Sequence, residues 1–354
     1  MRRVAIVLFN LGGPDSPEAI PQFLRNLFAD PVILGLPQPF RSLLGSYIAW
    51  KRVPVAMENY GLIGGRSPLL PQTRDQAEAL AARMTARRPD IEFKSFVCMR
   101  YWHPMAAEVV AEVKAWAPDK VVVLPLYPQY SITTSGSSMK DWRDFAAKAK
   151  LACPHVAVCC YPTLPGWVSA VAAGIEDALA KVDDPSRFRV IFSAHGLPKA
   201  VVDRGDPYPR HVEASVDAVV ETLHRPDMDW ILAYQSKVGP QTWIGPSTED
   251  VIEEAGKDGK SLLVVPIAFV SEHSETLVEL DIDYRDRAEK AGVPEYLRVP
   301  TVQCDPRFIG GLSDLVDFAL DQTCGPGEWM VSGDGCRKAC TAPGGKCAMD
   351  GQKS

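Results

Sequence analysis

Short apolar runs that alternate with longer helical stretches are the feature that most limits how this chain can fold. Runs such as VVVLPL and SLLVVPIAF are apolar on both faces, which is typical of parallel strands covered by helices on each side. The pattern therefore predicts an α/β fold built from doubly wound parallel sheets. The expected strands are 4–9, 94–99, 121–126, 156–161, 188–192, 229–233 and 261–267. The expected helices are 18–29, 75–87, 105–116, 138–150, 167–181, 209–224, 248–255, 273–290 and 310–322.

The chain is long enough for two domains. It has 354 residues, and one compact domain usually holds roughly 100 to 200. A Pro-rich turn at 162–166 follows the fourth expected strand and marks the seam. We expect an N-terminal domain over 1–163, a similar domain over 164–323 and a Cys-rich extension over 324–354.

Charge and hydropathy exclude several classes of protein. The net charge of −6 is unlike the basic surface that nucleic-acid binding needs. Two arginines precede the first apolar run as in a signal peptide, but Asn10 and the glycines that follow it end the run too early. No window approaches the roughly 18 apolar residues of a membrane span. We expect a cytoplasmic protein, and peripheral contact with the inner membrane stays open.

Residues that follow the expected strands define a candidate binding edge. In doubly wound sheets the ligands bind at the carboxyl ends of the strands. The strand exits here combine aromatic, imidazole and carboxylate groups, which suits a flat, largely apolar ligand with an ionic centre. These exits are 10–13, 100–103, 127–130, 194–197, 235–237 and 270–273.

An acidic series follows the last of these exits. Glu272, Glu275, Glu279, Asp283 and Asp286 recur at spacings of three or four, so several of them share one helix face. One interpretation is a solvated acidic face. The other is a path for a divalent cation, because such ions bind carboxylate and imidazole ligands.

His195 ends an apolar strand in the motif FSAHGLP. A histidine in this place is either a hydrogen-bonded structural group or a proton acceptor near neutral pH. We place His195 and Glu275 at the same sheet edge, because both follow strands that we assign to one sheet. A partly desolvated glutamate can also titrate toward neutral pH.

The segment 36–54 mixes apolar residues with Arg41, Lys51 and Arg52. It is either an amphipathic lip that rests on a membrane and accepts an apolar substrate, or a helical arm packed on its own domain.

Cysteines near the C-terminus suggest a metal site. Cys336, Cys340 and Cys347 lie in a glycine-rich tail with few apolar residues, and the candidates are zinc or an iron-sulfur cluster. A fourth ligand is needed, and Cys324, Cys153, Cys159 and Cys160 are available. The alternative is a reduced tail without a ligand.

Six segments together closely resemble the ferrochelatase family, which inserts ferrous iron into protoporphyrin in the terminal step of heme biosynthesis. They are NLGGP, FVCMRYWHP, PLYPQYSITTSGSS, FSAHGLPKAVVDRGDPYP, YQSKVGPQTWIGP and VVPIAFVSEHSETLVELDIDY, and the match runs from about residue 4 to 320. The resemblance implies two Rossmann-like domains with a porphyrin cleft between them and no soluble organic cofactor. It leaves a monomer or a homodimer open.

The same resemblance assigns site residues. It implies that His195 and Glu275 face each other across the macrocycle, with Glu279 and Asp283 behind Glu275 as ligands on the iron path. We favour His195 as the proton acceptor and the acidic series that includes Glu275 as the conduit for iron and protons, although these roles could be exchanged. The implied porphyrin contacts are Leu11, Tyr60, Arg100, Tyr101, Trp243, Phe269, Glu272 and His273.

The tail resembles ferrochelatases that hold a 2Fe-2S cluster. Ile132 stands where animal enzymes carry their first cluster cysteine, so the fourth ligand must come from elsewhere. Some bacterial members take it from the middle of the chain, which favours Cys160, with Cys159 as its neighbour. Two further functions stay open: metallation of coproporphyrin or insertion of cobalt, and a porphyrin or metal carrier without turnover.

Overall fold

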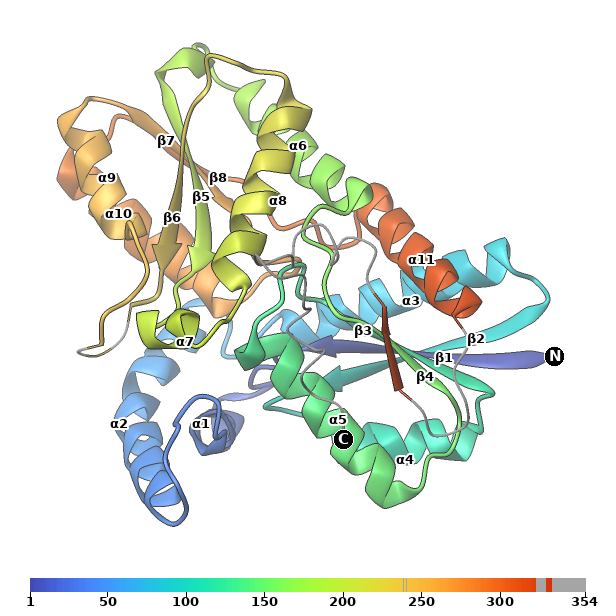
Figure 1. Ribbon diagram of the computed structural model, residues 1–354. Helices are drawn as coiled ribbons and strands as arrows, with labels where there is room; N and C mark the ends of the chain where they lie inside the picture. The colour runs from blue at the N-terminus through green and yellow to red at the C-terminus, as the bar shows by residue number, and fades with distance from the viewer. Residues whose placement is uncertain (238, 240, 323–328, 333–354) are drawn as a thin grey trace. The chain divides into compact units, whose positions relative to one another are not determined.

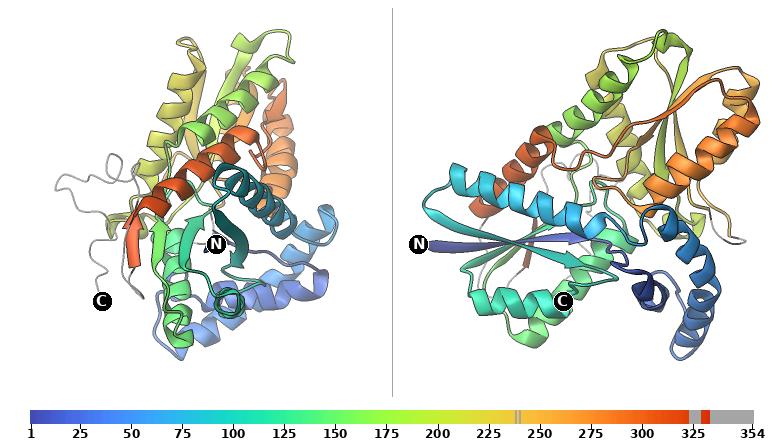
Figure 2. Two further views of the ribbon diagram at one scale, coloured as in Figure 1. Left: turned by 90° about the vertical axis from the view of Figure 1, so that its right-hand side faces the viewer. Right: turned by 180° about the vertical axis from the view of Figure 1, so that it is seen from behind.

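The computed structural model describes residues 1–237, 239, 241–322 and 329–332, which form two compact units. Unit 1 is Met1–Cys159 with Leu312–Ser332, and the described part of unit 2 is Cys160–Gly311. Each unit is built around a parallel sheet with helices on both faces (Figures 1 and 2). The predicted α/β fold class is therefore confirmed.

Unit 1 contains a five-stranded sheet in the order β2-β1-β3-β4-β9. Its interior strand β1, between β2 and β3, buries every residue from Val4 to Asn10, as a strand covered on both faces must. Helix α3 covers one face, and α4 and α5 cover the other (Figure 1). The strands are β1 Arg2–Asn10, β2 Ile91–Met99, β3 Lys120–Pro125, β4 His155–Val158 and β9 Trp329–Ser332. The helices are η1 Pro17–Ala19, α1 Ile20–Ala29, α2 Phe40–Leu62, α3 Leu69–Arg87, α4 Ala106–Trp116, the π-helix η2 Ile132–Gly136 and α5 Ser137–Ala149.

Unit 2 contains a four-stranded sheet in the order β6-β5-β7-β8. Helices α6 and α8 cover one face, and α9 and α10 cover the other (Figure 1). The strands are β5 Phe188–His195, β6 Asp229–Gln235, β7 Ser261–Pro266 and β8 Tyr296–Arg298. The helices are α6 Pro165–Leu179, η3 Pro185–Arg187, α7 Lys199–Asp203, α8 Tyr208–Leu223, α9 Thr248–Lys257, the π-helix η4 Glu275–Asp283, α10 Tyr284–Ala291 and α11 Pro306–Asp321, which begins in unit 2 and ends in unit 1.

The second unit ends earlier than the expected boundary at 323, because residues from Leu312 onward return to unit 1. Lys120, which is 3% exposed, holds the end of α11 within unit 1. Its Nζ donates to the carbonyl oxygens of Ala319, Leu320 and Gln322 at 3.0, 2.9 and 2.5 Å and so satisfies the C-terminal end of α11. The backbone of β9 then pairs with β4 in parallel register.

The helical segment that carries the acidic series differs from the expectation. The sequence predicts one ordinary helix over 273–290, whereas the structure has the π-helix η4 followed by α10. The N–H of Tyr284 bonds the carbonyl of Glu279 five residues earlier, as in a π-helix. Leu280 and Tyr284 anchor this segment in a core that includes Ile191, Val251 and Val264.

Candidate active site

His195 is the last residue of β5, at the carboxyl edge of the sheet in unit 2. Its Nδ1 lies 2.8 Å from Oε2 of Glu275, the first residue of the π-helix η4. The side chains of His195 and Glu275 are 41% and 25% exposed, so the pair is open to solvent on one side. The structure thus brings together the two residues that the sequence singled out.

This contact corrects the expectation that His195 and Glu275 face each other across a macrocycle. An aromatic ring held between two side chains separates them by about 7 Å, because each van der Waals contact needs about 3.5 Å. A 2.8 Å hydrogen bond leaves no such space. Both side chains therefore lie on the same side of any ring that binds at this edge.

The pair is ionised at neutral pH. Burial opposes the charge on His195, but the adjacent Glu275 carboxylate outweighs burial and raises the pKa of His195 to about 9. Burial likewise opposes the charge on Glu275, and the imidazolium overcomes it and lowers the pKa of Glu275 to about 2. His195 is thus an imidazolium beside a carboxylate.

His273 lies next to the ion pair but remains neutral. It is 6% exposed, and its Nδ1 is 3.7 Å from Oε1 of Glu275. Burial lowers the pKa of His273 more than Glu275 raises it, and the charge of His195 lowers it further. Its Nε2 has no hydrogen-bond partner. Within the part of the chain that the structure describes, no three His, Cys, Asp or Glu side chains form a preformed metal cage.

Glu279 lies four residues after Glu275 in η4. Ser236 Oγ and Gln235 Nε2 donate to its Oε2 at 2.5 and 3.1 Å, and the Tyr284 hydroxyl donates to Oε1 at 3.1 Å. Burial and the charge of Glu275 raise the pKa of Glu279 despite these donors. Ser236 has a φ of 65°, a left-handed conformation that is uncommon for a residue with a side chain.

The remaining acidic residues divide into two groups. Asp283 is exposed at the end of η4, and partial burial together with Asp286 raises its pKa. Asp286 is exposed and binds Lys290, as on a solvated face. Glu272 is 5% exposed and accepts hydrogen bonds from Arg298, Thr301 and Thr276. Both of its oxygens are thus bonded within the protein, and the porphyrin contact of Glu272 stays a prediction.

Other expected contacts in unit 2 lie near His195. The ring of Trp243 packs against Gly196, where an added Cβ would lie 3.3 Å from a ring carbon and 2.9 Å from the Gln235 carbonyl oxygen. Any side chain at Gly196 would therefore displace Trp243 or the strand end. Phe269 follows β7 and is partly buried.

The expected contacts in unit 1 surround Asp30, which the sequence reasoning missed. The Asp30 Oδ2 accepts hydrogen bonds from Arg100, Tyr101 and Ser137 at 2.7, 2.9 and 2.8 Å. Tyr101 and Tyr60 are 1% and 4% exposed in a core cluster against which Leu11 packs. The side chains of both tyrosines are thus almost fully covered by other residues of unit 1. No sequence pattern marks Asp30 as the partner of Arg100.

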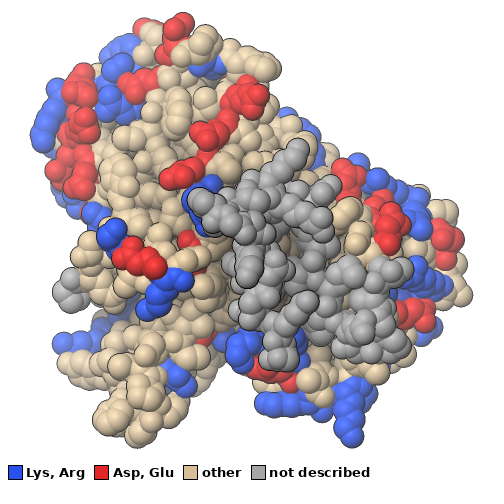
Figure 3. Space-filling view, viewed as in Figure 1, with Lys and Arg blue, Asp and Glu red and all other residues tan. Residues whose placement is uncertain are grey.

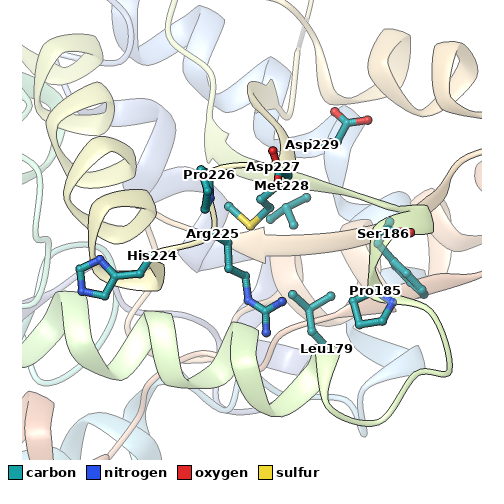
Figure 4. Close-up of a pocket in the computed structure, with 11 residues that line it drawn as sticks. Leu179, Pro185, Ser186, His224, Arg225, Pro226, Asp227, Met228 and Asp229 are labelled. Carbon is teal, nitrogen blue, oxygen red and sulfur yellow. The ribbon is translucent and has the colours of Figure 1, made fainter.

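A pocket of about 340 Å³ lies at the opposite end of the unit 2 sheet (Figure 4). Phe188 and Val190 at the start of β5 contribute to it, about 23 Å along the strand from His195. Arg225 lines this pocket but already forms a bidentate pair with Glu176. The pocket is therefore distinct from the His195 site.

The Glu275→Gln variant tests the cause of the high pKa of His195. Removal of the carboxylate charge should lower that pKa from about 9 toward the ordinary value of about 6.5. The pKa can be followed by NMR titration of ¹³C-labelled histidine, with His195→Ala to assign the signal. Asp286→Asn is the control, because Asp286 is exposed and bound to Lys290. A pKa that stays near 9 in Glu275→Gln would contradict this electrostatic account.

The pKa shifts of His195 and Glu275 determine the pH range in which their ion pair stabilises the fold. The folded-state pKa of His195 is raised, so the contribution from the His195 charge is fully present below about 6.5 and is lost as the pH rises through about 9. The pKa of Glu275 is lowered, so its contribution is present above about 4.5 and is lost as the pH falls toward 2.

Comparisons with known proteins show the family of this chain. A family model described as Ferrochelatase matches residues 3–320. The chain is 50% identical over 350 residues to a protein named ferrochelatase from Phenylobacterium zucineum, covering 98% of each chain. It is 46% identical over 346 residues to one from Caulobacter vibrioides, covering 98% of this chain and 97% of that one.

Among solved structures, SirB from Bacillus subtilis with Fe³⁺ has a TM-score of 0.53 at 12% identity and covers 91% of this chain and 96% of its own. At that identity the similarity concerns the fold alone. The full-length matches above establish that the chain belongs to the ferrochelatase family, the lyase-class metal chelatases that insert iron into a porphyrin for heme synthesis.

Proposed function

We propose that this chain inserts ferrous iron into protoporphyrin IX and that metal and protons exchange at the His195–Glu275 pair. The observation that carries this proposal is the 2.8 Å contact between His195 Nδ1 and Glu275 Oε2 at the carboxyl edge of the sheet. Imidazole and carboxylate are nitrogen and oxygen ligands that suit a first-row divalent metal. Their position at the strand ends is where ligands bind in such folds.

The reaction itself sets the demands on the site. A free porphyrin carries two N–H protons in the space that the metal must enter. The ring has to bend so that its nitrogen lone pairs are exposed, and on the order of 1 to 5 kcal/mol of strain can come from binding of the ring periphery. Entry of Fe²⁺ releases two protons, so the total charge is conserved.

The ion pair indicates an order of events. His195 holds a proton in the pair, so it accepts none from a pyrrole until that proton has left. A divalent cation that binds Glu275 neutralises the charge that raises the pKa of His195. The imidazolium then releases its proton and becomes a base. We therefore assign the metal to Glu275 and the two pyrrole protons to His195, which accepts them one at a time and passes the first on through Glu279 before it accepts the second.

Glu279 and Asp283 supply the route for released protons. Glu279 has a raised pKa and lies close enough to His195 to raise the pKa of that imidazole in turn. Asp283 is exposed four residues further along η4. Together they extend the acidic series from the ion pair to solvent.

The His195→Ala variant tests the assignment. It should lower the rate of iron insertion by about 10² or more, because general acid-base groups contribute factors of this size. The assay is the iron-dependent loss of porphyrin fluorescence under anaerobic, reducing conditions. His224→Asn is the control, because His224 is exposed after the last residue of α8 and lies at the opposite end of the unit 2 sheet.

Near-normal turnover of His195→Ala would contradict the role of His195. Stoichiometric porphyrin binding without metallated product in the unaltered protein would indicate a carrier instead. The same assay on coproporphyrin and with Co²⁺ tests the alternative substrates. We expect protoporphyrin to be preferred, because the exposed surface of α2 is apolar.

We also propose that α2 contacts a membrane. Its exposed apolar residues are Phe40, Leu43, Leu44, Tyr47, Trp50, Val55, Met57 and Leu62. Trp50 and Leu43 are 70% and 69% exposed, and Lys51 and Arg52 lie beside them. In Figure 3 the surface over α1 and α2, at the lower left, is mainly uncharged with a few basic groups. No helix within the described ranges is long and apolar enough to span a bilayer.

The double variant Leu43→Glu/Trp50→Glu tests this contact. It should abolish cosedimentation with vesicles of phosphatidylcholine and phosphatidylglycerol, because two exposed apolar groups that would enter the membrane interface become charged. Thr85→Glu/Thr222→Glu adds the same charge at exposed helix positions and should bind like the unaltered protein. Equal binding by all three proteins would assign α2 to packing within the protein or to another partner.

A 2Fe-2S cluster bound by Cys336, Cys340, Cys347 and Cys160 is a further part of the proposal. The first three residues lie outside the described residues, and Cys160 is a buried thiol that forms no disulfide. The spacing of the tail thiolates and the resemblance noted above support the cluster. The cluster takes no part in the insertion steps at His195 and Glu275.

The Cys336→Ser variant tests the cluster. Anaerobically purified protein should show visible absorption bands with iron and sulfide, and the variant should lose them because one thiolate ligand is gone. Cys304→Ser is the control, since Cys304 lies outside the proposed ligand set. A colourless protein with stoichiometric zinc would contradict the cluster.

A further inference from the structure

Arg298 connects two carboxylates that flank the π-helix η4. It lies on the edge strand β8, where it pairs in register with Val264 of β7. Its Nε and Nη2 donate to the two carboxylate oxygens of Asp281, both at 2.7 Å. Its Nη1 donates to Oε1 of Glu272 at 3.1 Å. The guanidinium thus binds one residue before η4 and one within it.

These contacts are largely shielded from water. The side chains of Arg298 and Glu272 are 8% and 7% exposed, and that of Asp281 is 27% exposed. Glu272 Oε1 also accepts the Thr301 N–H at 3.0 Å, and its Oε2 accepts the Thr276 hydroxyl at 2.5 Å. Thr276 Oγ1 in turn accepts the His273 N–H at 2.9 Å. The network therefore fixes the backbone on both sides of Glu275.

A π-helix needs such support. Its i to i+5 hydrogen bonds are rare in proteins and occur mostly as short segments at functional sites. Asp281 lies two residues after Glu279, and Glu272 lies three residues before Glu275. A guanidinium can bind Asp281 through two donors and Glu272 through a third because its donors form a planar fork, whereas a lysine ammonium lacks this fork.

We propose that Arg298 is a positioning residue for iron insertion, which holds η4 so that Glu275 meets His195 and Glu279 meets Ser236. It contacts neither the metal nor the porphyrin and acts through the placement of Glu275. The inference rests on the proposed function for its kinetic consequence. Its structural consequence, the order of η4, can be measured without turnover.

The test compares four variants. Arg298→Met removes the guanidinium and its hydrogen bonds to Asp281 and Glu272. Arg298→Lys keeps the positive charge without the planar set of donors. Asp281→Asn weakens only the contact between Arg298 and η4. Arg287→Met is the matched control, because the Arg287 side chain forms ion pairs with the surface residues Glu249 and Glu253 of α9. Asp281→Asn keeps the proposal testable if Arg298→Met fails to fold, since it leaves no buried charge unpaired.

Two measurements decide the outcome. In hydrogen exchange followed by mass spectrometry, Arg298→Met and Asp281→Asn should exchange faster in peptides that cover 275–284, and Arg287→Met should not. In anaerobic kinetics the same two variants should raise the KM for Fe²⁺ about tenfold or more and leave the KM for porphyrin within about twofold. Arg298→Lys should recover part of the loss.

Three results would overturn the proposal. One is unchanged exchange over 275–284 in Asp281→Asn. Another is an equal rise of both KM values, which a general loss of folded enzyme would produce. The third is kinetics in Arg298→Met that match Arg287→Met. If the unaltered protein inserts no iron, the proposed function fails, while the exchange data still decide whether Arg298 orders η4.

Discussion

The ion pair between His195 and Glu275 is the interaction on which the rest of the site depends. Two charges near the end of a buried strand are unfavourable unless they are paired, and each of them shifts the pKa of the other in the direction that keeps both ionised. The neighbouring groups follow from this arrangement. His273 stays neutral beside an imidazolium, and Glu279 resists ionisation beside a carboxylate. The pKa values of all four groups are thus linked to the charges of this one pair.

Most of the fold could be predicted because its strands are apolar on both faces and its helices are long. All seven expected strands are present, and each expected helix has a counterpart. The exceptions have physical reasons. β8 has three residues and β9 has four, which is too short for a pattern. Helix α2 has large exposed apolar residues and a proline at position 54, so its sequence lacks the periodicity of a packed helix.

The site could be predicted only in part, because sequence identifies strand ends but not contacts across the fold. His195 and Glu275 follow strands β5 and β7 of one sheet, so their proximity was foreseeable. Asp30 and Arg100 are 70 positions apart and Glu272 and Arg298 are 26 positions apart, and no sequence signal indicates that the two residues of either pair meet. Glu272 belongs to the same acidic spacing as Glu275, yet it is bonded within the protein. The π-helix was also not foreseeable, because its sequence fits an ordinary helix.

In the proposed mechanism, metal entry and proton release are coupled through the same electrostatic interaction. At an effective dielectric constant of about 20, two unit charges 4 Å apart interact by about 4 kcal/mol. A divalent cation at Glu275 therefore repels a charged His195 strongly and favours its neutral form. Loss of the proton at that moment produces a base beside the ring that is about to lose its own protons. The ion pair keeps His195 protonated before the metal arrives, so the base is formed where and when the pyrrole protons must leave.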